Sequence, residues 1–256
     1  MTHAEKRVWL IRRLLEEGGH ENPIPESPVE QRRLLRALMN VRPPMPAGDD
    51  FLAVQDAYLR ERVAEKGVVD AAGIEPLRDR MCLWRGDITR LNADAIVNAA
   101  NSGMTGCYQP NHGCIDNVIH TMAGVQLRLE CARLMEAQGF PEPTGQAKVT
   151  PGFNLPAAHV IHTVGTICRG GVVTLANLRE LESCYRSCME AADAHGLRSV
   201  AFCCISTGVF GFPQRRGAEV AVRTVGECLA RGSRVEKVIF DVFTSEDEAI
   251  YRAILG

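Results

Sequence analysis

The sequence predicts an α/β protein: a three-layer α/β/α domain with a mixed central sheet, preceded by an N-terminal helical extension. Two observations predict this fold. From about residue 80 onward, short apolar runs of strand length alternate with longer segments of helical periodicity. Before that point the chain is rich in charge, and its apolar residues recur at helical spacing. We therefore divide the chain into an extension over residues 1–79 and a main domain over residues 80–256.

Three helices are expected in the extension. The first carries an apolar stripe around Leu10. The second begins with Ser27 as N-cap and Pro28 in the first helical position. The third runs from about residue 49 to residue 66 and ends at Gly67. No group of reactive side chains stands out in these helices, so we expect a cap that packs against the main domain.

The main domain is expected to contain six strands and five helices. The strands are expected at residues 81–84, 95–98, 147–150, 160–164, 199–205 and 237–243. The helices are expected at residues 114–123, 125–138, 175–195, 214–230 and 246–254. Such an alternation favours one mixed sheet with helices on both faces.

Composition excludes several classes of protein. The chain has 256 residues, of which 46% are hydrophobic and 23% charged, as in ordinary globular proteins. A formal net charge of -2 argues against nonspecific nucleic-acid binding. No apolar run approaches the roughly 20 residues of a membrane span. Most of the ten cysteines lie in apolar periodic segments, and no secretory signal is visible at the N-terminus. We therefore expect a reducing, cytoplasmic setting without disulfides.

Polar or small residues follow four of the predicted strands, at the edge where α/β sheets bind ligands. Asp87 can accept a hydrogen bond from a ligand amino group, or it can cap its own turn. Asn98 and Asn101 can bind a hydroxyl-rich ligand such as ribose, or they can serve a turn. The glycine-rich segment 205–213 can bind phosphate through N–H groups, or it can be an ordinary strand-to-helix turn.

A loop before the first helix of the main domain contains Cys107, His112 and Cys114 in a C-x4-H-x-C spacing. Two thiolates and an imidazole form a good zinc donor set, and three protein ligands leave the fourth position open, as in catalytic sites. The spacing is not a common zinc-finger pattern, and incidental cysteines are the alternative. Asp116 follows, where it can stabilise the helix dipole or act as a general base.

Taken together, these motifs resemble those of macrodomains, the ADP-ribose-binding α/β/α family. The resembling segments are GDIT at 86–89, DAIVNAAN at 94–101, CIDNVIHTMAG at 114–124, TGQAKVTPGFNLPAAHVIHTVG at 144–165 and ISTGVFGFP at 205–213. Hydrolytic macrodomains carry a run of glycines before a Val-Asp pair, whereas this chain has CYQPNHGC at 107–114. In this departure the chain is similar to the zinc-dependent macrodomains of microbes, which also carry an N-terminal helical extension.

The resemblance implies roles for individual residues. Zinc would be held by Cys107, His112 and Cys114, and the catalytic residues would be Asn101 and Asp116. The residues implied to contact ADP-ribose are Asp87, Ile88, Asn101, Ser206, Thr207, Gly208, Val209, Phe210 and Phe243. Among these, Asp87 would contact the adenine amino group, Asn101 the distal ribose and residues 206–210 the diphosphate. Phe243 would stack on adenine, or it would only pack in the core. His120 and His162 are interpreted as packed structural histidines.

By the same resemblance, the expected function is a zinc-dependent mono-ADP-ribosyl hydrolase that acts on proteins modified at Asp or Glu. Two alternatives stay open: a reader that binds ADP-ribose without cleaving it, and a hydrolase of free ADP-ribose derivatives. The expected partners are ADP-ribose and mono-ADP-ribosylated protein, with a sirtuin-type ADP-ribosyltransferase and a lipoyl-carrier protein suggested by the zinc-dependent branch. Neither nucleic acid nor membrane is expected as a partner.

Overall fold

The computed structural model of the protein describes residues 1–256. The chain begins with three helices, α1 (His3–Glu17), α2 (Pro28–Val41) and α3 (Asp49–Lys66). Ser27 is the N-cap of α2, with Pro28 in its first turn. Gly67 ends α3 with a φ of 81°, in the region that favours glycine. The three predicted helices, the start of the second and the end of the third are therefore confirmed.

The three N-terminal helices share a small apolar core of their own. Leu10, Phe51 and Leu59 are among its buried residues, and Val125 of the main domain completes it. Burying a side chain of this size contributes about 1.5–3 kcal/mol. A polar contact ties the two parts together, because Gln55 Oε1 accepts the main-chain N–H of Val125 at 2.9 Å. The extension is thus packed against the main domain, as predicted.

The main sheet has seven strands in the order β2-β3-β9-β8-β5-β7-β6. Their bounds are β2 (Pro76–Arg78), β3 (Met81–Arg85), β5 (Ala95–Ala100), β6 (Ala147–Pro151), β7 (His159–Val164), β8 (Ser199–Phe202) and β9 (Lys237–Val242). The five inner strands are parallel, while β2 and β6 are antiparallel edge strands. A separate two-stranded sheet pairs β1 (Val69–Asp70) with β4 (Leu91–Asn92). The predicted mixed sheet is confirmed, although β2 was not predicted and places the first strand of the sheet before residue 80.

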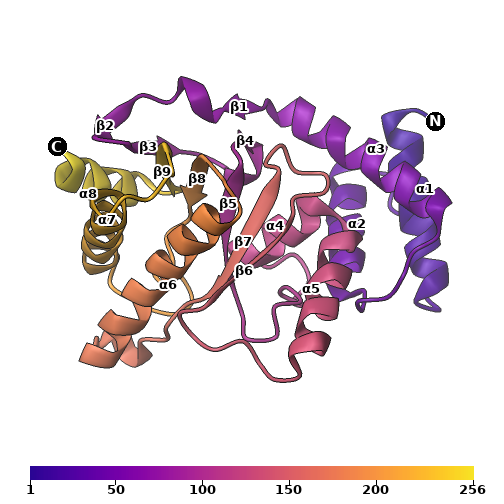
Figure 1. Ribbon diagram of the computed structural model, residues 1–256. Helices are drawn as coiled ribbons and strands as arrows, with labels where there is room; N and C mark the ends of the chain where they lie inside the picture. Colours follow the sequence, from indigo (N-terminus) through magenta and orange to yellow (C-terminus); the bar gives the residue numbers. More distant parts are fainter.

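Helices cover both faces of the sheet (Figure 1). Their bounds are α4 (Ile115–Ala123), α5 (Val125–Gln138), α6 (Leu175–Ala194), α7 (Gln214–Ala230) and α8 (Ser245–Leu255), with short 3-10 helices η1 (Ala71–Gly73), η2 (Ile88–Arg90) and η3 (Arg169–Gly171). In Figure 1, α6, α7 and α8 lie on one side of the sheet, and α4 and α5 lie on the other, next to the extension. No helix has both the length and the apolar character needed to cross a bilayer. All ten cysteines are free thiols, as expected.

The parallel inner strands place the polar loops of the sequence at one edge of the sheet. Strands β3, β5, β8 and β9 run in the same direction, so their carboxyl ends lie together. Asp87 follows β3, Asn101 follows β5, and Phe243 follows β9. Strand β8 ends at Phe202 rather than at the predicted residue 205, because the chain leaves the sheet there and enters the glycine-rich loop. This edge therefore collects the residues from which a site can be built.

Candidate functional site

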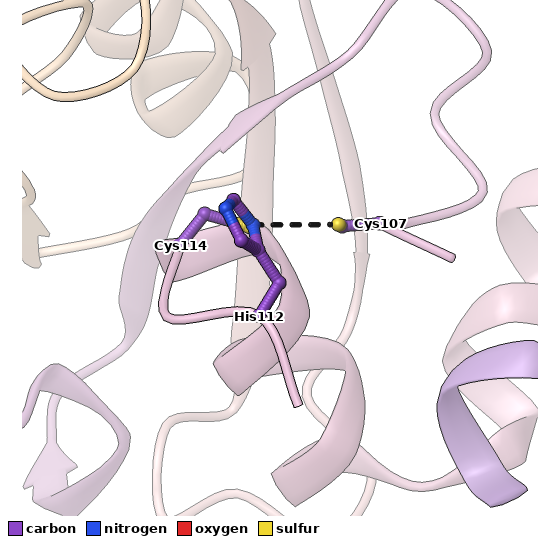
Figure 2. A group of neighbouring side chains, drawn as sticks. All are labelled: Cys107, His112 and Cys114. Atoms are coloured by element: carbon purple, nitrogen blue, oxygen red, sulfur yellow. Dashed lines mark hydrogen bonds between the residues drawn. The ribbon is translucent and has the colours of Figure 1, made fainter. Parts of the chain in front are cut away.

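Cys107, His112 and Cys114 come together in the loop between β5 and α4 (Figure 2). The Cys107 Sγ lies 3.6 Å from His112 Nδ1, and the donor atoms of the three residues all lie within 4.8 Å of one another. Each of the three side chains is half-buried. Cys114 is also the N-cap of α4, where its Sγ accepts the N–H of Asn117 at 3.5 Å. The structure thus gathers the donors that the spacing predicted.

The chemistry of these three side chains suits zinc. Two thiols and one imidazole are preferred zinc ligands, and three donors leave a position for water or substrate. Burial, together with the neighbouring Cys107 and Asp116, raises the pKa of the Cys114 thiol to about 11. A bound dication would lower this raised pKa, because it stabilises the thiolate and deprotonates a coordinating thiol. The residues present therefore fit a zinc ion.

A second group of possible ligands lies in the interior and has a different character. His120, Cys131 and His162 are all buried, with their donor atoms within 4.8 Å of one another. Both ring nitrogens of His162 already have polar neighbours, Asn98 Nδ2 at 3.1 Å and Thr150 Oγ1 at 3.0 Å. Burial also strongly raises the pKa of the Cys131 thiol. These histidines are packed inside the domain, as predicted.

The loop of residues 107–114, called the metal-ligand loop after its candidate ligands, is held by hydrogen bonds from Asn117 and Arg36. The Asn117 side chain donates to the main-chain oxygens of Cys107, at 3.3 Å, and Gln109, at 3.0 Å. Arg36, on α2 of the extension, donates to the main-chain oxygen of His112 at 2.6 Å and to Asn117 Oδ1 at 2.7 Å. The extension therefore helps to position the loop that carries the candidate ligands.

The end of α2 supports the same loop at a second point. Asn40 Oδ1 accepts the N–H of Asn111, a residue with a φ of 56°, at 3.0 Å. Arg128 donates to the main-chain oxygens of Asn40 and Arg42, both at 2.6 Å, and its guanidinium lies 4.2 Å from the ring centre of Tyr108. No sequence signal predicts the hydrogen bonds between Asn40 and Asn111 or between Arg128 and the end of α2, because they join residues more than 70 positions apart.

Asn101 and Asp116 face each other at the end of β5. Asn101 is exposed, and its amide donates to Asp116 Oδ2 at 3.3 Å and to the main-chain oxygen of Gly106 at 3.1 Å. Asp116 is only 4% exposed, and its Oδ1 accepts a hydrogen bond from Asn98 at 2.8 Å. Burial raises the pKa of Asp116 to about 6, although the two amide donors oppose the rise.

Only one amide of the Asn98–Asn101 pair can reach a ligand. Asn98 has no exposed surface, because its side chain lies inside the domain between Asp116 and His162. The prediction that both amides bind ribose is therefore wrong for Asn98. Its role is to orient the Asp116 carboxylate that in turn holds Asn101.

The loop after β8 presents unpaired donors at the same edge of the sheet. The main-chain N–H groups of Gly208, Val209 and Phe210 donate no hydrogen bond within the chain. Ser206 has a φ of 67°, and its buried Oγ also has no hydrogen-bond partner. The N–H of Phe212 donates to the Ser206 main-chain oxygen at 3.0 Å, which closes the loop. A row of free N–H groups of this kind suits a phosphate.

Two of the predicted contact residues have side chains that are engaged elsewhere. Ile88 is 1% exposed and packs in the main core. The Thr207 hydroxyl donates to the main-chain oxygen of Cys204 at 3.1 Å. At Ile88 only main-chain groups are available to a ligand, and at Thr207 the hydroxyl proton is already used.

Asp87 and Phe243 lie at the other end of this edge. Asp87 Oδ1 accepts the N–H of Thr89 at 3.1 Å, and Asp87 Oδ2 pairs with Lys66 Nζ at 2.8 Å. Burial raises the pKa of Asp87, but Lys66 and Thr89 outweigh it, so the pKa lies below its usual value. Phe243 is 80% exposed, which rules out the core-packing alternative and leaves its ring free to stack.

Comparison with known proteins gives a consistent result. A family model described as Macro domain matches residues 97–221. A protein of Treponema medium named protein-ADP-ribose hydrolase is 50% identical over the whole of both chains. A protein of the same name from Staphylococcus aureus strain MSSA476 is 50% identical over 90% of this chain and 86% of its own. The crystal structure of a Trypanosoma brucei macrodomain in complex with ADP-ribose aligns with a TM-score of 0.67 and 28% identity, over 91% of this chain and 97% of that one.

Proposed function

The chain belongs to the macrodomain family, and we propose that it is a zinc-dependent hydrolase that removes mono-ADP-ribose from aspartate or glutamate side chains of modified proteins. Its hydrolase class follows from 50% identity over the full chain to a protein-ADP-ribose hydrolase. The observation that supports the zinc-dependent part is the convergence of Cys107, His112 and Cys114 beside Asn101 and Asp116.

In this proposal ADP-ribose lies along the carboxyl edge of the sheet. The adenine ring lies against Phe243, with its amino group toward Asp87. The diphosphate lies over the free N–H groups of the loop after β8. The distal ribose then reaches Asn101, next to the metal-ligand loop. The order of these groups along the edge matches the order of parts in the ligand.

The residues of this chain divide the work of hydrolysis. Asn101, exposed at the end of β5, orients the distal ribose. Asp116 holds the Asn101 amide, because amide donors occupy both of its oxygens. A zinc ion held by Cys107, His112 and Cys114 would supply a Lewis acid that lowers the pKa of water or a hydroxyl group and stabilises negative charge on the leaving oxygen. Asp87, Phe243 and the loop after β8 bind the adenine and the diphosphate and so position the substrate.

The proposal also covers the partner proteins of the chain and its cellular compartment. The zinc-dependent macrodomains that this chain resembles are associated with a sirtuin-type ADP-ribosyltransferase and a lipoyl-carrier protein. We propose the same two proteins as partners of this chain. Ten free thiols favour a reducing compartment, the cytoplasm.

The test is a paired measurement on the purified chain. Zinc content and release of ADP-ribose from a protein modified at glutamate or aspartate are measured for the unaltered chain and for Cys107→Ala. We expect about one zinc per chain and a release rate that collapses, with zinc lost, in the variant. Cys228→Ala is the control, since Cys228 lies on α7, outside the group of possible ligands.

Other outcomes separate the alternatives. Zinc without release of ADP-ribose by either chain would favour a reader of ADP-ribose. Faster hydrolysis of an acetylated or phosphorylated ADP-ribose than of modified protein would favour a hydrolase of free derivatives. No zinc in the unaltered chain, with release unchanged in Cys107→Ala, would remove the metal from the mechanism and leave Asn101 and Asp116 to support it.

A further inference from the structure

A groove of about 510 Å³ lies between α2 and α3 of the extension and α4 of the main domain. Its walls carry five cationic side chains and no carboxylate. The cationic residues are Arg32, Arg33, Arg36, Arg62 and Lys66. The whole chain has a net charge of -2, so this concentration of positive charge is local. We call this feature the basic groove.

Three of the five cationic side chains form no ion pair within the protein. Arg32 is half-buried and Arg33 exposed, and neither has an ion-pair partner. Arg36 donates to a main-chain oxygen and to an amide oxygen, which are both neutral. The groove therefore keeps a positive potential that attracts an anionic partner.

The other two cationic side chains of the basic groove form ion pairs with carboxylates. Arg62 pairs with Glu65 on the same helix. Lys66 pairs with Asp87, the residue proposed to contact adenine. The basic groove thus meets the candidate site at its adenine end.

The groove also borders the metal-ligand loop. Asn111 lines the groove and directly precedes His112 in the chain. Helix α4 contributes Val118 and Met122 to the wall. The groove is therefore bordered both by the partner of Asp87 and by the loop that carries the candidate ligands.

The size and lining of the groove favour a polypeptide over a small ion. Its volume of about 510 Å³ is many times the roughly 30 Å³ that one water molecule occupies. Apolar side chains lie among the cations: Leu35, Met39, Tyr58, Leu59, Val118 and Met122. Cationic side chains beside apolar ones suit a segment that carries both carboxylate and apolar side chains.

We propose that the basic groove binds an acidic polypeptide segment of the ADP-ribosylated protein, next to the modified residue. This inference rests on the proposed function, because only a protein substrate brings such a segment to the site. The extension then has a second role besides support of the metal-ligand loop: it selects substrates by the charge around the modification.

The first experiment measures binding without catalysis. The probe is a fluorescein-labelled peptide of twelve residues built from glutamate and leucine, and its partner probe has glutamine in place of glutamate. We expect only the acidic peptide to bind, and we expect Arg32→Glu with Arg33→Glu to weaken its binding by about tenfold or more. Arg12→Glu with Arg60→Glu is the control, since it changes charge equally at exposed positions outside the groove.

Three results would overturn the proposal. Equal binding of the acidic and the neutral peptide would remove the role of charge. Unchanged binding by the Arg32 and Arg33 double variant would place the peptide elsewhere. Tighter binding of a twelve-nucleotide single strand that displaces the peptide would make the groove a nucleic-acid site. Circular dichroism and zinc content of both double variants establish that the fold is kept.

The second experiment measures hydrolysis of two proteins that differ only in acidic or neutral residues around the modification. We expect the Arg32 and Arg33 variant to lose about tenfold in kcat/KM on the acidic substrate, mainly through KM, and little on the neutral one. An equal loss on both substrates would contradict docking. Peptide binding with no hydrolysis by any form would refute the proposed function and leave the acidic-polypeptide site standing.

Discussion

The guanidinium group of Arg36 donates a hydrogen bond to the main-chain oxygen of His112 at 2.6 Å, across 76 positions of the sequence. Arg36 belongs to the extension and His112 to the proposed zinc ligands. The same guanidinium also holds Asn117, whose amide fixes the main-chain oxygen of Cys107. The geometry of two of the three donors therefore depends on one side chain outside the main domain.

Replacement of Arg36 is expected to weaken zinc binding. Arg36→Ala removes the donor to His112 and frees Asn117, so the donors are no longer held in place before the metal binds. Loss of such a supporting contact commonly lowers metal affinity by about 10- to 100-fold. Competition for zinc with a coloured chelator measures the change, and Arg12→Ala, on the exposed side of α1, is the control. Zinc affinity equal to that of the unaltered chain would refute the supporting role.

Replacement of Asn101 is expected to separate catalysis from metal binding. Asn101→Ala removes the amide that we place on the distal ribose but no zinc ligand. We expect kcat to fall by roughly 100-fold, as on removal of a donor that acts on the reacting group, with zinc content unchanged. Single-turnover release of ADP-ribose measures it, with Asn92→Ala, at an exposed position of strand β4, as the control. Full activity of Asn101→Ala would take this residue out of the mechanism.

Replacement of Phe243 is expected to weaken binding of ADP-ribose without loss of stability. The ring is 80% exposed, so Phe243→Ala removes little packing. Stacking of a base on an aromatic ring contributes about 1–3 kcal/mol, which corresponds to a loss of at least about fivefold in affinity. Titration calorimetry with ADP-ribose measures it. Phe243→Trp should bind normally, and Phe140→Ala, at another exposed phenylalanine, should have no effect.

The elements that the sequence predicted best have local signals at their ends. Helix α3 ends at Gly67, which adopts a positive φ there. Strand β8 was predicted three residues too long, because Cys203 and Ile205 are apolar and buried although they lie beyond the strand. Burial and strand pairing are separate properties, and an apolar pattern reports only burial. Strand β2 was missed for the opposite reason, since its residues are all exposed.

The candidate site also contains residues that local spacing predicts and residues that only the fold brings together. Cys107, His112 and Cys114 lie within eight residues, so their spacing, together with the resemblance to zinc-dependent macrodomains, predicted that they meet. Arg36 and Asn40 reach the same loop only because α2 docks beside α4. No local pattern encodes that docking, and their side chains are ordinary members of a charged helix in the sequence. The supporting contacts therefore needed the structure.

Acid should destabilise the fold through His162. This residue has no exposed surface, and burial lowers its pKa to about 3. The unfolded chain binds a proton at this histidine near pH 6.5 and the folded chain does not, so the stability it contributes is complete above about pH 6.5 and is lost as the pH falls toward 3. We expect the free energy of unfolding in urea to decrease by up to about 1.4 kcal/mol per pH unit below 6.5 from this group alone. His162→Asn should be less stable at neutral pH but should show a shallower decrease, whereas His20→Asn, at an exposed position, should keep the original slope. An unchanged slope in His162→Asn would mean that acid unfolds the chain through other groups.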